Sequence, residues 1–155
     1  MKKIASFTVD HRFIKEKIYI SRIDGDITTY DVRMRRPNTE NVMSNILMHS
    51  FEHLFATFMR NSSIGEDIIY VGPMGCQTGF YLLVRNACHK DVLSEVKSVL
   101  EKISVYDGEM PGASEIECGN YRTLDVEVAK EEALRYLEKI KDQTEDDLTY
   151  ETGEE

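Results

Sequence analysis

The spacing of hydrophobic and polar residues changes along the chain between the period of strands and the period of helices. Short apolar, β-rich segments predict strands at residues 3–9, 17–23, 27–35, 67–72 and 79–85. Helical spacing predicts helices at residues 44–60, 90–104 and 126–141. Residues 24–26, Asp-Gly-Asp, favour a hairpin turn between two of the strands, because Gly tolerates a positive φ. A hairpin in a mixed order of elements predicts an α+β fold, with helices packed on an antiparallel sheet.

The two later helices each carry one apolar face. Their predicted inward residues are Val92, Val96, Val99, Leu100 and Ile103 in the first and Ala129, Ala133, Leu137 and Ile140 in the second. Asp125 is placed to cap the last helix, and residues 107–119, which hold Gly108, Pro111 and Gly112, are expected to form a loop. We therefore predict one domain over residues 1–141.

The segment at residues 43–60 carries polar side chains on an otherwise apolar helix. His49, Glu52 and His53 share an arc of about 100° around the helix axis. The opposite face and the flanks of the arc are apolar, with Leu47, Phe51, Leu54 and Phe58 opposite and Ile46 and Met48 beside it. Such a helix is expected to be buried, and polar groups inside a core need partners.

A metal ion would satisfy both histidines. Side chains four residues apart on a helix have Cβ atoms about 5–6 Å apart, so two imidazoles can reach one ion. Glu52 would lie beside the ion as a general acid or base, which is the logic of the motif H-x-x-E-H. The alternative is two core histidines with backbone partners and a surface glutamate.

A useful metal site needs a third ligand, and the spacing alone does not identify it. The remaining histidines, the carboxylates and the cysteines are all candidates. Cys76 and Cys118 lie in loops, where functional groups tend to sit, whereas Cys88 just before a helix is predicted to be a packing residue. A cysteine near the ion but not bound to it would act as a thiolate acid/base.

Length, composition and charge argue against a membrane protein and against a nucleic-acid-binding protein. The chain has 155 residues, no apolar run reaches the ~18 residues of a membrane span, and no membrane partner is expected. The net charge is −9, and residues 142–155 hold seven acidic and no basic side chains, which predicts a disordered acidic tail. No basic surface for nucleic acid is expected. Three cysteines without a secretory signal predict free thiols in the cytoplasm.

Five separated motifs add a more specific indication. They are His49-Ser-Phe-Glu52-His53-Leu-Phe-Ala, Pro73-Met-Gly-Cys76-Gln-Thr-Gly-Phe-Tyr, Cys118-Gly-Asn-Tyr, Ser6-Phe7 with Asp10-His11, and Asp31-Val-Arg33 with Pro37-Asn38. Together they resemble the S-ribosylhomocysteine lyase family, the LuxS-type autoinducer-2 synthases. The motifs occur in the family's order from residue 6 to about residue 141.

The resemblance implies a LuxS-type, metallopeptidase-like fold and a carbon–sulfur lyase that acts on S-ribosylhomocysteine. An internal redox of the ribose and a β-elimination would give homocysteine and 4,5-dihydroxy-2,3-pentanedione, the precursor of autoinducer-2. His49, His53 and Cys118 would bind one divalent metal per subunit. Fe(II) is expected natively, with Zn or Co able to replace it, and no organic cofactor is expected.

The resemblance also implies roles for other residues and for a second subunit. Cys76 and Glu52 would be the two acid/base residues. The ribose and homocysteine parts of the substrate would be held by Ser6, His11 and Arg33. The family is a homodimer whose two active sites lie at the interface. The chain departs from the family's pattern at two places. Tyr70-Val71-Gly72 replaces the usual Asp-Ile-Ser, and Arg36 replaces the usual Gln.

Two other functions share part of the pattern. An inverzincin-type metallopeptidase also has H-x-x-E-H, but it needs an acidic third ligand and usually has a much longer chain. A non-catalytic metal-binding or thiol-redox module would account for the ligands. It would not account for Glu52 beside them, nor for Cys76 without a Cys-x-x-Cys partner.

Overall fold

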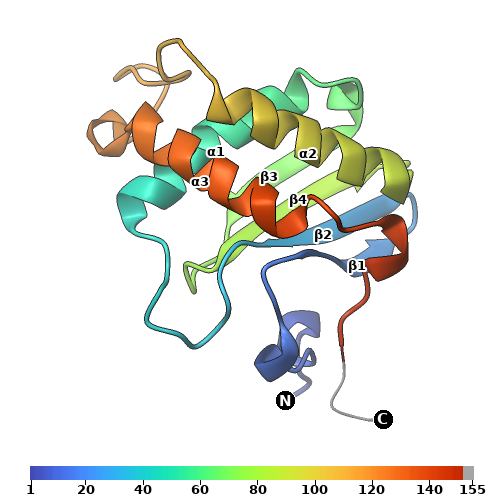
Figure 1. The fold of residues 1–155 in the computed structure, drawn as a ribbon. Coiled ribbons are helices and arrows are strands. Elements are labelled where there is room, and N and C mark those ends of the chain that lie inside the picture. The colour runs from blue at the N-terminus through green and yellow to red at the C-terminus, as the bar shows by residue number, and fades with distance from the viewer. Residues whose placement is uncertain (152–155) are drawn as a thin grey trace.

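In the computed structural model, which describes residues 1–151, three α-helices pack on one face of a four-stranded sheet (Figure 1). The strands are β1 (Ile18–Asp24), β2 (Ile27–Arg33), β3 (Ile68–Pro73) and β4 (Gly79–Arg85), and the helices are α1 (Asn45–Arg60), α2 (His89–Ser104) and α3 (Val126–Ile140). The sheet is antiparallel, in the order β1-β2-β4-β3. The predicted α+β fold is confirmed.

The strands and helices begin where local chemistry predicts. Asp24 pairs with Ile27 across the hairpin, and Gly25 in the turn has φ of 60°, in the left-handed region that glycine adopts most easily. The side chain of Ser44 accepts a hydrogen bond from the Leu47 N–H and caps α1. Asp125 caps α3 in the same way, as predicted.

The core lies between the sheet and the three helices. All the inward positions predicted for α2 and α3 are buried except Leu137, which is half-buried at the edge of the core. None of the helices within residues 1–151 combines the length and the apolar character that crossing a bilayer requires.

The N-terminal segment is not a strand, so the prediction for residues 3–9 is wrong. Ala5–Phe7 and His11–Phe13 form short 3₁₀ turns (η1 and η2). The sheet has two edges, β1 and β3, and another segment already occupies part of the outer edge of β1. The N–H of Ile20 donates to the carbonyl of Leu148 at 2.7 Å, so the C-terminal segment holds this position.

Residues 142–151 are packed, and the prediction of a disordered tail is wrong for them. A short 3₁₀ turn, η5 (Glu145–Asp147), lies between the buried side chains of Gln143 and Leu148. The amide of Gln143 accepts from the Ile18 N–H at 3.0 Å and donates to the Ile18 carbonyl at 2.6 Å. The packed domain therefore continues at least to residue 151. Residues 152–155 of the predicted tail lie outside the described residues.

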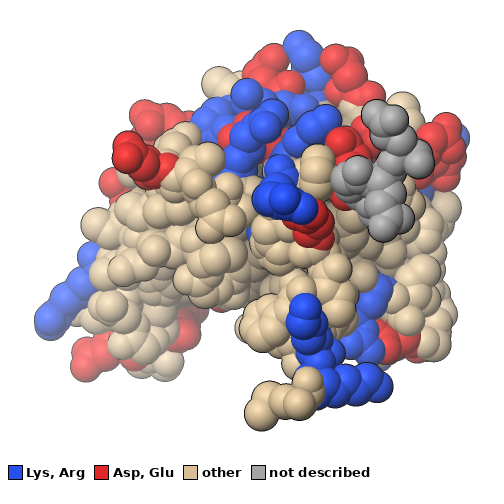
Figure 2. Space-filling view, turned by 90° about the horizontal axis from the view of Figure 1, so that it is seen from below, with Lys and Arg blue, Asp and Glu red and all other residues tan. Residues whose placement is uncertain are grey.

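The other face of the sheet is turned away from the helices, and the N-terminal segment and the last described residues of the C-terminal segment lie beneath it (Figure 1). Side chains alternate along β2, so Tyr30 and Val32 join the core while Asp31 and Arg33 point to this outer face. Viewed from below, much of the surface is uncharged (Figure 2). The outer face therefore buries an ion pair beneath a largely uncharged surface.

Candidate metal centre and thiol pocket

The structure brings together the three residues expected to bind metal. His49 and His53 project from α1, and Cys118 comes from the loop before α3. The Cys118 Sγ lies 3.4 Å from the His49 Nε2 and 3.8 Å from the His53 Nε2. One candidate ligand atom from each residue lies within 4.8 Å of the other two. We call these three residues the metal triad.

A backbone carbonyl orients His53. Its Nδ1–H donates to the Pro111 carbonyl at 2.8 Å, which leaves the Nε2 lone pair free on the side of Cys118. Gly112 makes this approach possible, since its φ is 70° and a Cβ there would lie 3.1 Å from the His53 Nδ1. The loop at residues 107–119 therefore fixes the orientation of the His53 ring.

A hydroxyl orients His49. The Thr123 Oγ1 lies 2.6 Å from the His49 Nδ1, and the Thr123 hydroxyl donates its own proton to the Asn120 carbonyl at 3.2 Å. Thr123 must therefore accept from the His49 Nδ1–H, and the His49 Nε2 is left as a free ligand atom. Burial first, and then His53, lower the pKa of His49, which favours the neutral form that binds metal; Glu52 opposes this shift.

The sulfur of Cys118 completes the donor set. The Asn120 N–H points at the Cys118 Sγ at 3.4 Å, a contact that suits a thiolate. Two neutral imidazole nitrogens and one thiolate suit a divalent transition metal, and three protein ligands leave a position open. The metal triad therefore fits a catalytic metal site.

Sequence reasoning missed the residues that support the triad. Ser50 is fully buried on α1, and its Oγ accepts the Asp125 N–H at 2.8 Å, which fixes the start of α3 against the ligand-bearing helix. Thr123 orients His49 as described above. A polar serine on an apolar helix surface was the available signal for Ser50, but no sequence signal paired Thr123 with a histidine 74 residues away.

Glu52 lines a cavity beside the metal triad. The cavity has a volume of about 280 Å³ and is lined by Asn45, Met48, His49, Glu52, Pro73, Met74, Gly75 and Gln77. The expectation that the polar arc of α1 is enclosed in the core is wrong, because His49, Glu52 and His53 are all half-buried. The sheet covers only one face of α1, and the polar arc faces loops and this open cavity.

A second cavity, which we call the thiol pocket, gathers the other predicted residues. It has a volume of about 270 Å³ and is lined by Ser6, Phe7, His11, Arg33, Pro73, Met74, Gly75, Cys76 and Tyr81. All three side chains expected to hold substrate thus lie around the thiol of Cys76. The His11 Nδ1–H donates to the Val9 carbonyl at 2.9 Å, so the Nε2 of His11 is available to a ligand.

Buried polar contacts lead from Cys76 to a charged pair. The Cys76 Sγ lies 2.9 Å from the Thr78 Oγ1, which accepts a hydrogen bond from the Arg33 Nη1 at 3.1 Å. The Thr78 hydroxyl is therefore free to donate its proton to the sulfur. Arg33 is held by Asp31 through two bonds of 2.9 and 2.7 Å. Burial disfavours the charge on Arg33, but these bonds raise its pKa above the ordinary value.

The two cavities are separate within one chain. They share only Pro73, Met74 and Gly75, so the loop between β3 and β4 forms a wall of each. Glu52 and Cys76 consequently line different cavities of the same chain. The structure brings together the ligands with Glu52, and Cys76 with the substrate-binding candidates, but it does not place the two groups in one cavity.

Two other side chains considered as ligands lie elsewhere. Cys88 is exposed at the start of α2, so its prediction as a packing residue is wrong. A residue that begins a helix at the surface has no core to enter. The His89 Nδ1 pairs with the hydroxyl of Tyr30 at 2.5 Å, away from the metal triad.

Two of the residues that depart from the family pattern, Tyr70 and Gly72, depend on each other sterically. Tyr70 and Gly72 lie on β3, where alternate residues share a face. A Cβ at residue 72 would lie 2.3 Å from the Tyr70 ring, so the ring occupies the space above the glycine. Tyr70 is 53% exposed and faces the solvent on the outer side of the sheet.

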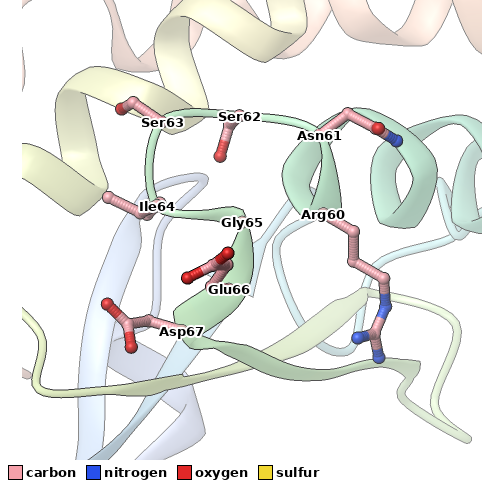
Figure 3. A pocket seen from close by; sticks show the side chains of 8 residues that line it. All are labelled: Arg60, Asn61, Ser62, Ser63, Ile64, Gly65, Glu66 and Asp67. Carbon is pink, nitrogen blue, oxygen red and sulfur yellow. The ribbon is translucent and has the colours of Figure 1, made fainter.

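A further pocket at the end of α1 has no catalytic residues. It has a volume of about 370 Å³ and is lined by the consecutive residues 60–67 (Figure 3). Arg60 reaches from α1 toward β3, where its guanidinium donates to the carbonyls of Ile68 and Ile69 at 3.2 and 3.0 Å. This cation is therefore used to join the helix to the sheet.

Comparisons with known proteins agree with the motifs. The model of the family described as S-ribosylhomocysteinase (LuxS) matches residues 4–147. A protein of Desulfotalea psychrophila named S-ribosylhomocysteine lyase is 42% identical over 157 aligned positions, which cover 97% of this chain and 99% of the relative. Proteins of the same name from Borreliella afzelii and Finegoldia magna are 40% and 43% identical, each with 97% of this chain and 99% of the relative covered.

Proposed function

The chain belongs to the LuxS family and acts as an S-ribosylhomocysteine lyase, and we propose that it does so with the metal triad, Glu52 and Cys76. The observation that carries this assignment of residues is the convergence of His49, His53 and Cys118 beside a cavity lined by Glu52. The substrate is S-ribosylhomocysteine, and the products are homocysteine and 4,5-dihydroxy-2,3-pentanedione.

The metal triad would hold one divalent metal, with Fe(II) as the native ion and Zn or Co able to replace it. Both histidines have their Nδ1–H engaged by Thr123 and Pro111, so both Nε2 atoms are free for the same ion. When bound, the metal supplies Lewis-acid polarisation of the carbonyl and hydroxyl oxygens of the opened sugar. No organic cofactor is needed, because the oxidation and the reduction both occur within the sugar.

Glu52 and Cys76 would move the protons. In the opened aldehyde form of the ribose, one base removes a proton from C2 and the proton is returned to C1, which moves the carbonyl from C1 to C2. A second such exchange moves it to C3. Loss of a C4 proton then expels homocysteine from C5 as the thiolate, which takes up a proton. The enol left between C4 and C5 gains a proton at C5 and loses its hydroxyl proton, which gives the dione. Every step needs a base on one carbon and an acid on another atom, so two shuttles suit the sequence.

The environment of Cys76 supports a role in proton transfer. In the thiolate form its sulfur would accept the Thr78 proton, while Arg33 donates to the same hydroxyl and adds a positive charge nearby. Ser6, His11 and Arg33 would hold the substrate, since all three line the thiol pocket. A guanidinium, an imidazole and a hydroxyl together suit the carboxylate and hydroxyl groups of this substrate.

A homodimer would complete the active site. Within one chain Glu52 and Cys76 line separate cavities, so a partner chain would place its thiol pocket against the metal triad. The outer face of the sheet is largely uncharged (Figure 2) and exposes Ile4, Phe7 and Tyr70. A further cavity of about 360 Å³ lies on the same face, lined in part by Ile4, Tyr70 and Leu83. This face would be the dimer interface.

Two remaining expectations follow from cysteine chemistry. All three cysteines are free, which supports a reducing compartment such as the cytoplasm. A metallopeptidase of the inverzincin type is disfavoured, because the third residue of the triad is the thiol of Cys118 and not a carboxylate.

The test is release of homocysteine from S-ribosylhomocysteine, measured with a thiol reagent. Protein loaded anaerobically with Fe(II) should release one homocysteine per substrate consumed. The Cys76→Ala protein, loaded in the same way, should release almost none. Fe(II)-loaded wild-type protein that binds one metal per chain and yields no homocysteine would refute the lyase function.

A further inference from the structure

The C-terminal segment reaches the thiol pocket through Tyr150. The Tyr150 hydroxyl donates to the Asp31 Oδ2 at 2.7 Å. Its ring stacks on Tyr19, with ring centroids 4.6 Å apart and an angle of 12° between the planes. Burial first, and then Asp31, raise the pKa of Tyr150, so the hydroxyl keeps its proton and acts as a donor to the carboxylate.

Tyr150 adds a donor to a carboxylate that already holds Arg33. Asp31 is 1% exposed, and its two oxygens accept the Nε and Nη2 of Arg33. With the carboxylate fixed from both sides, the guanidinium plane is fixed as well. The remaining Nη1 then points to Thr78, which contacts the sulfur of Cys76.

The segment that carries Tyr150 is anchored independently of this contact. Gln143 bonds both backbone groups of Ile18, and the Leu148 carbonyl accepts the Ile20 N–H. Leu148 itself is 2% exposed. These contacts hold the C-terminal segment along β1 as far as Leu148. Tyr150, two residues later, is therefore held close to Asp31 by a packed segment.

We infer that Tyr150 is a positioning residue for the lyase reaction, acting through Asp31 on Arg33 and, through Thr78, on Cys76. The inference rests on the proposed function, in which Arg33 holds substrate and Cys76 moves protons. We call the sequence Tyr150–Asp31–Arg33–Thr78–Cys76 the relay. The C-terminal segment thus contributes to the active site without contacting the substrate.

The test compares Tyr150→Phe with the control Glu151→Gln in the full-length, Fe(II)-loaded protein. Phenylalanine keeps the ring that stacks on Tyr19 and removes only the hydroxyl. Glu151 forms a surface ion pair with Lys15 at 3.1 Å and lies next to Tyr150 in the chain. We expect Tyr150→Phe to lower kcat about threefold to tenfold, as fits the loss of one hydrogen bond to a charged group, and to raise KM by no more than the same factor, because Arg33 also holds substrate. Glu151→Gln should match the wild type.

Two further measurements separate positioning from folding and from the assigned reaction. Alkylation of Cys76 by iodoacetamide, followed by peptide mass with Cys88 as the internal reference, should slow about twofold or more in Tyr150→Phe, because the thiolate is the nucleophile. In an Arg33→Lys background, where the bidentate pair is already lost, Tyr150→Phe should change kcat less than about twofold further.

Each result has a defined meaning. Unchanged kcat and unchanged Cys76 alkylation in Tyr150→Phe would overturn the inference. A lower melting temperature with unchanged kcat per folded enzyme would also overturn it, since the role would then be structural only. If wild-type protein releases no homocysteine but Tyr150→Phe still slows Cys76 alkylation, the relay stands and the proposed function fails.

Discussion

The metal triad and the thiol pocket are built in different ways. The triad uses α1 and the segment that leads from α2 to α3, and its histidines are oriented by a carbonyl and a hydroxyl of that segment. The thiol pocket uses the N-terminal segment, β2 and the loop after β3, and it is supported by the C-terminal segment. The first region can form from two neighbouring pieces of structure, whereas the second requires both ends of the chain.

The two regions also differ in charge and exposure. The triad is half-buried and consists of two imidazoles and one thiol that could hold a metal ion. Beneath the thiol pocket, Asp31 and Arg33 are 1% and 3% exposed, so a charged pair is held out of water before any ligand arrives. Such pairs are tolerated only when their hydrogen bonds are satisfied. The triad therefore gathers groups that suit a cation at a half-buried site, whereas the thiol pocket depends on the packing of the two terminal segments.

Loss of a ligand should have the largest effect, and it should affect the triad alone. His49→Ala, His53→Ala and Cys118→Ala should each lose the metal and lower turnover by on the order of 10³-fold or more, since removing charge stabilisation alone costs about 10²–10³. Elemental analysis and homocysteine release measure both quantities. Cys88→Ala is the matched control and should keep metal and turnover. One metal per chain in all three variants would contradict the assignment.

Loss of a proton shuttle should separate activity from metal content. Cys76→Ala and Glu52→Gln should keep one metal per chain while turnover falls about 10²–10⁴-fold. In holo-protein the exposed Cys76 should alkylate readily, while Cys118 should alkylate only after chelation. If Cys118 reacts first and Cys76 is protected in the holo-protein, the roles of the two cysteines are reversed.

The sequence pattern predicted the two histidines of the triad better than its third ligand, Cys118, or the thiol pocket, and the reason is physical. Helical spacing places His49 and His53 together on α1 without reference to the rest of the chain. The residues of the thiol pocket come together only through long-range packing, and here the resemblance to the LuxS family, not the spacing, supplied Ser6, His11 and Arg33. A likeness of the fold to metallopeptidases stays a prediction.

The errors in the sequence-based predictions share one cause. Residues 3–9 alternate weakly like a strand, and residues 142–155 are acidic like a disordered tail. Both predictions were based on the local sequence alone. The contact of Leu148 with the edge of β1 is a tertiary interaction that no local stretch of sequence contains. The contact of Tyr150 with Asp31 could not be predicted from the sequence for the same reason, because a single aromatic residue among acidic residues shows no hydrophobic periodicity.

A smaller effect should follow from removing the hydrogen-bond acceptor that orients His49 while keeping the histidine itself. Thr123→Val keeps the shape of the side chain but leaves the His49 Nδ1–H without its acceptor. We expect metal affinity to fall about 10- to 100-fold, as for other partners of metal-bound histidines. Competition with a chromophoric chelator measures the affinity. Thr144→Val, at the start of η5, is the control and should leave it unchanged. Equal affinities for both variants would show that the Thr123 hydroxyl does not support the site.

The last prediction tests how the two regions meet. If each active site combines the triad and Glu52 of one chain with the thiol pocket of its partner, two inactive variants can complement each other. In a mixture of Cys76→Ala and Glu52→Gln, half of the dimers are mixed after subunit exchange, and one of the two sites in each is intact. Activity should then recover to about a quarter of the wild-type value.

A second mixture serves as the control for this recovery. Cys76 and Arg33 line the same pocket of the same chain, so every site in a mixed dimer of Cys76→Ala and Arg33→Ala keeps one defect. That mixture should stay inactive. Recovery in the second mixture but not in the first, with subunit exchange shown by native mass spectrometry, would place Glu52 and Cys76 in one chain. The loop at residues 73–75 would then have to move aside, and the separation of the two cavities would not reflect the working enzyme.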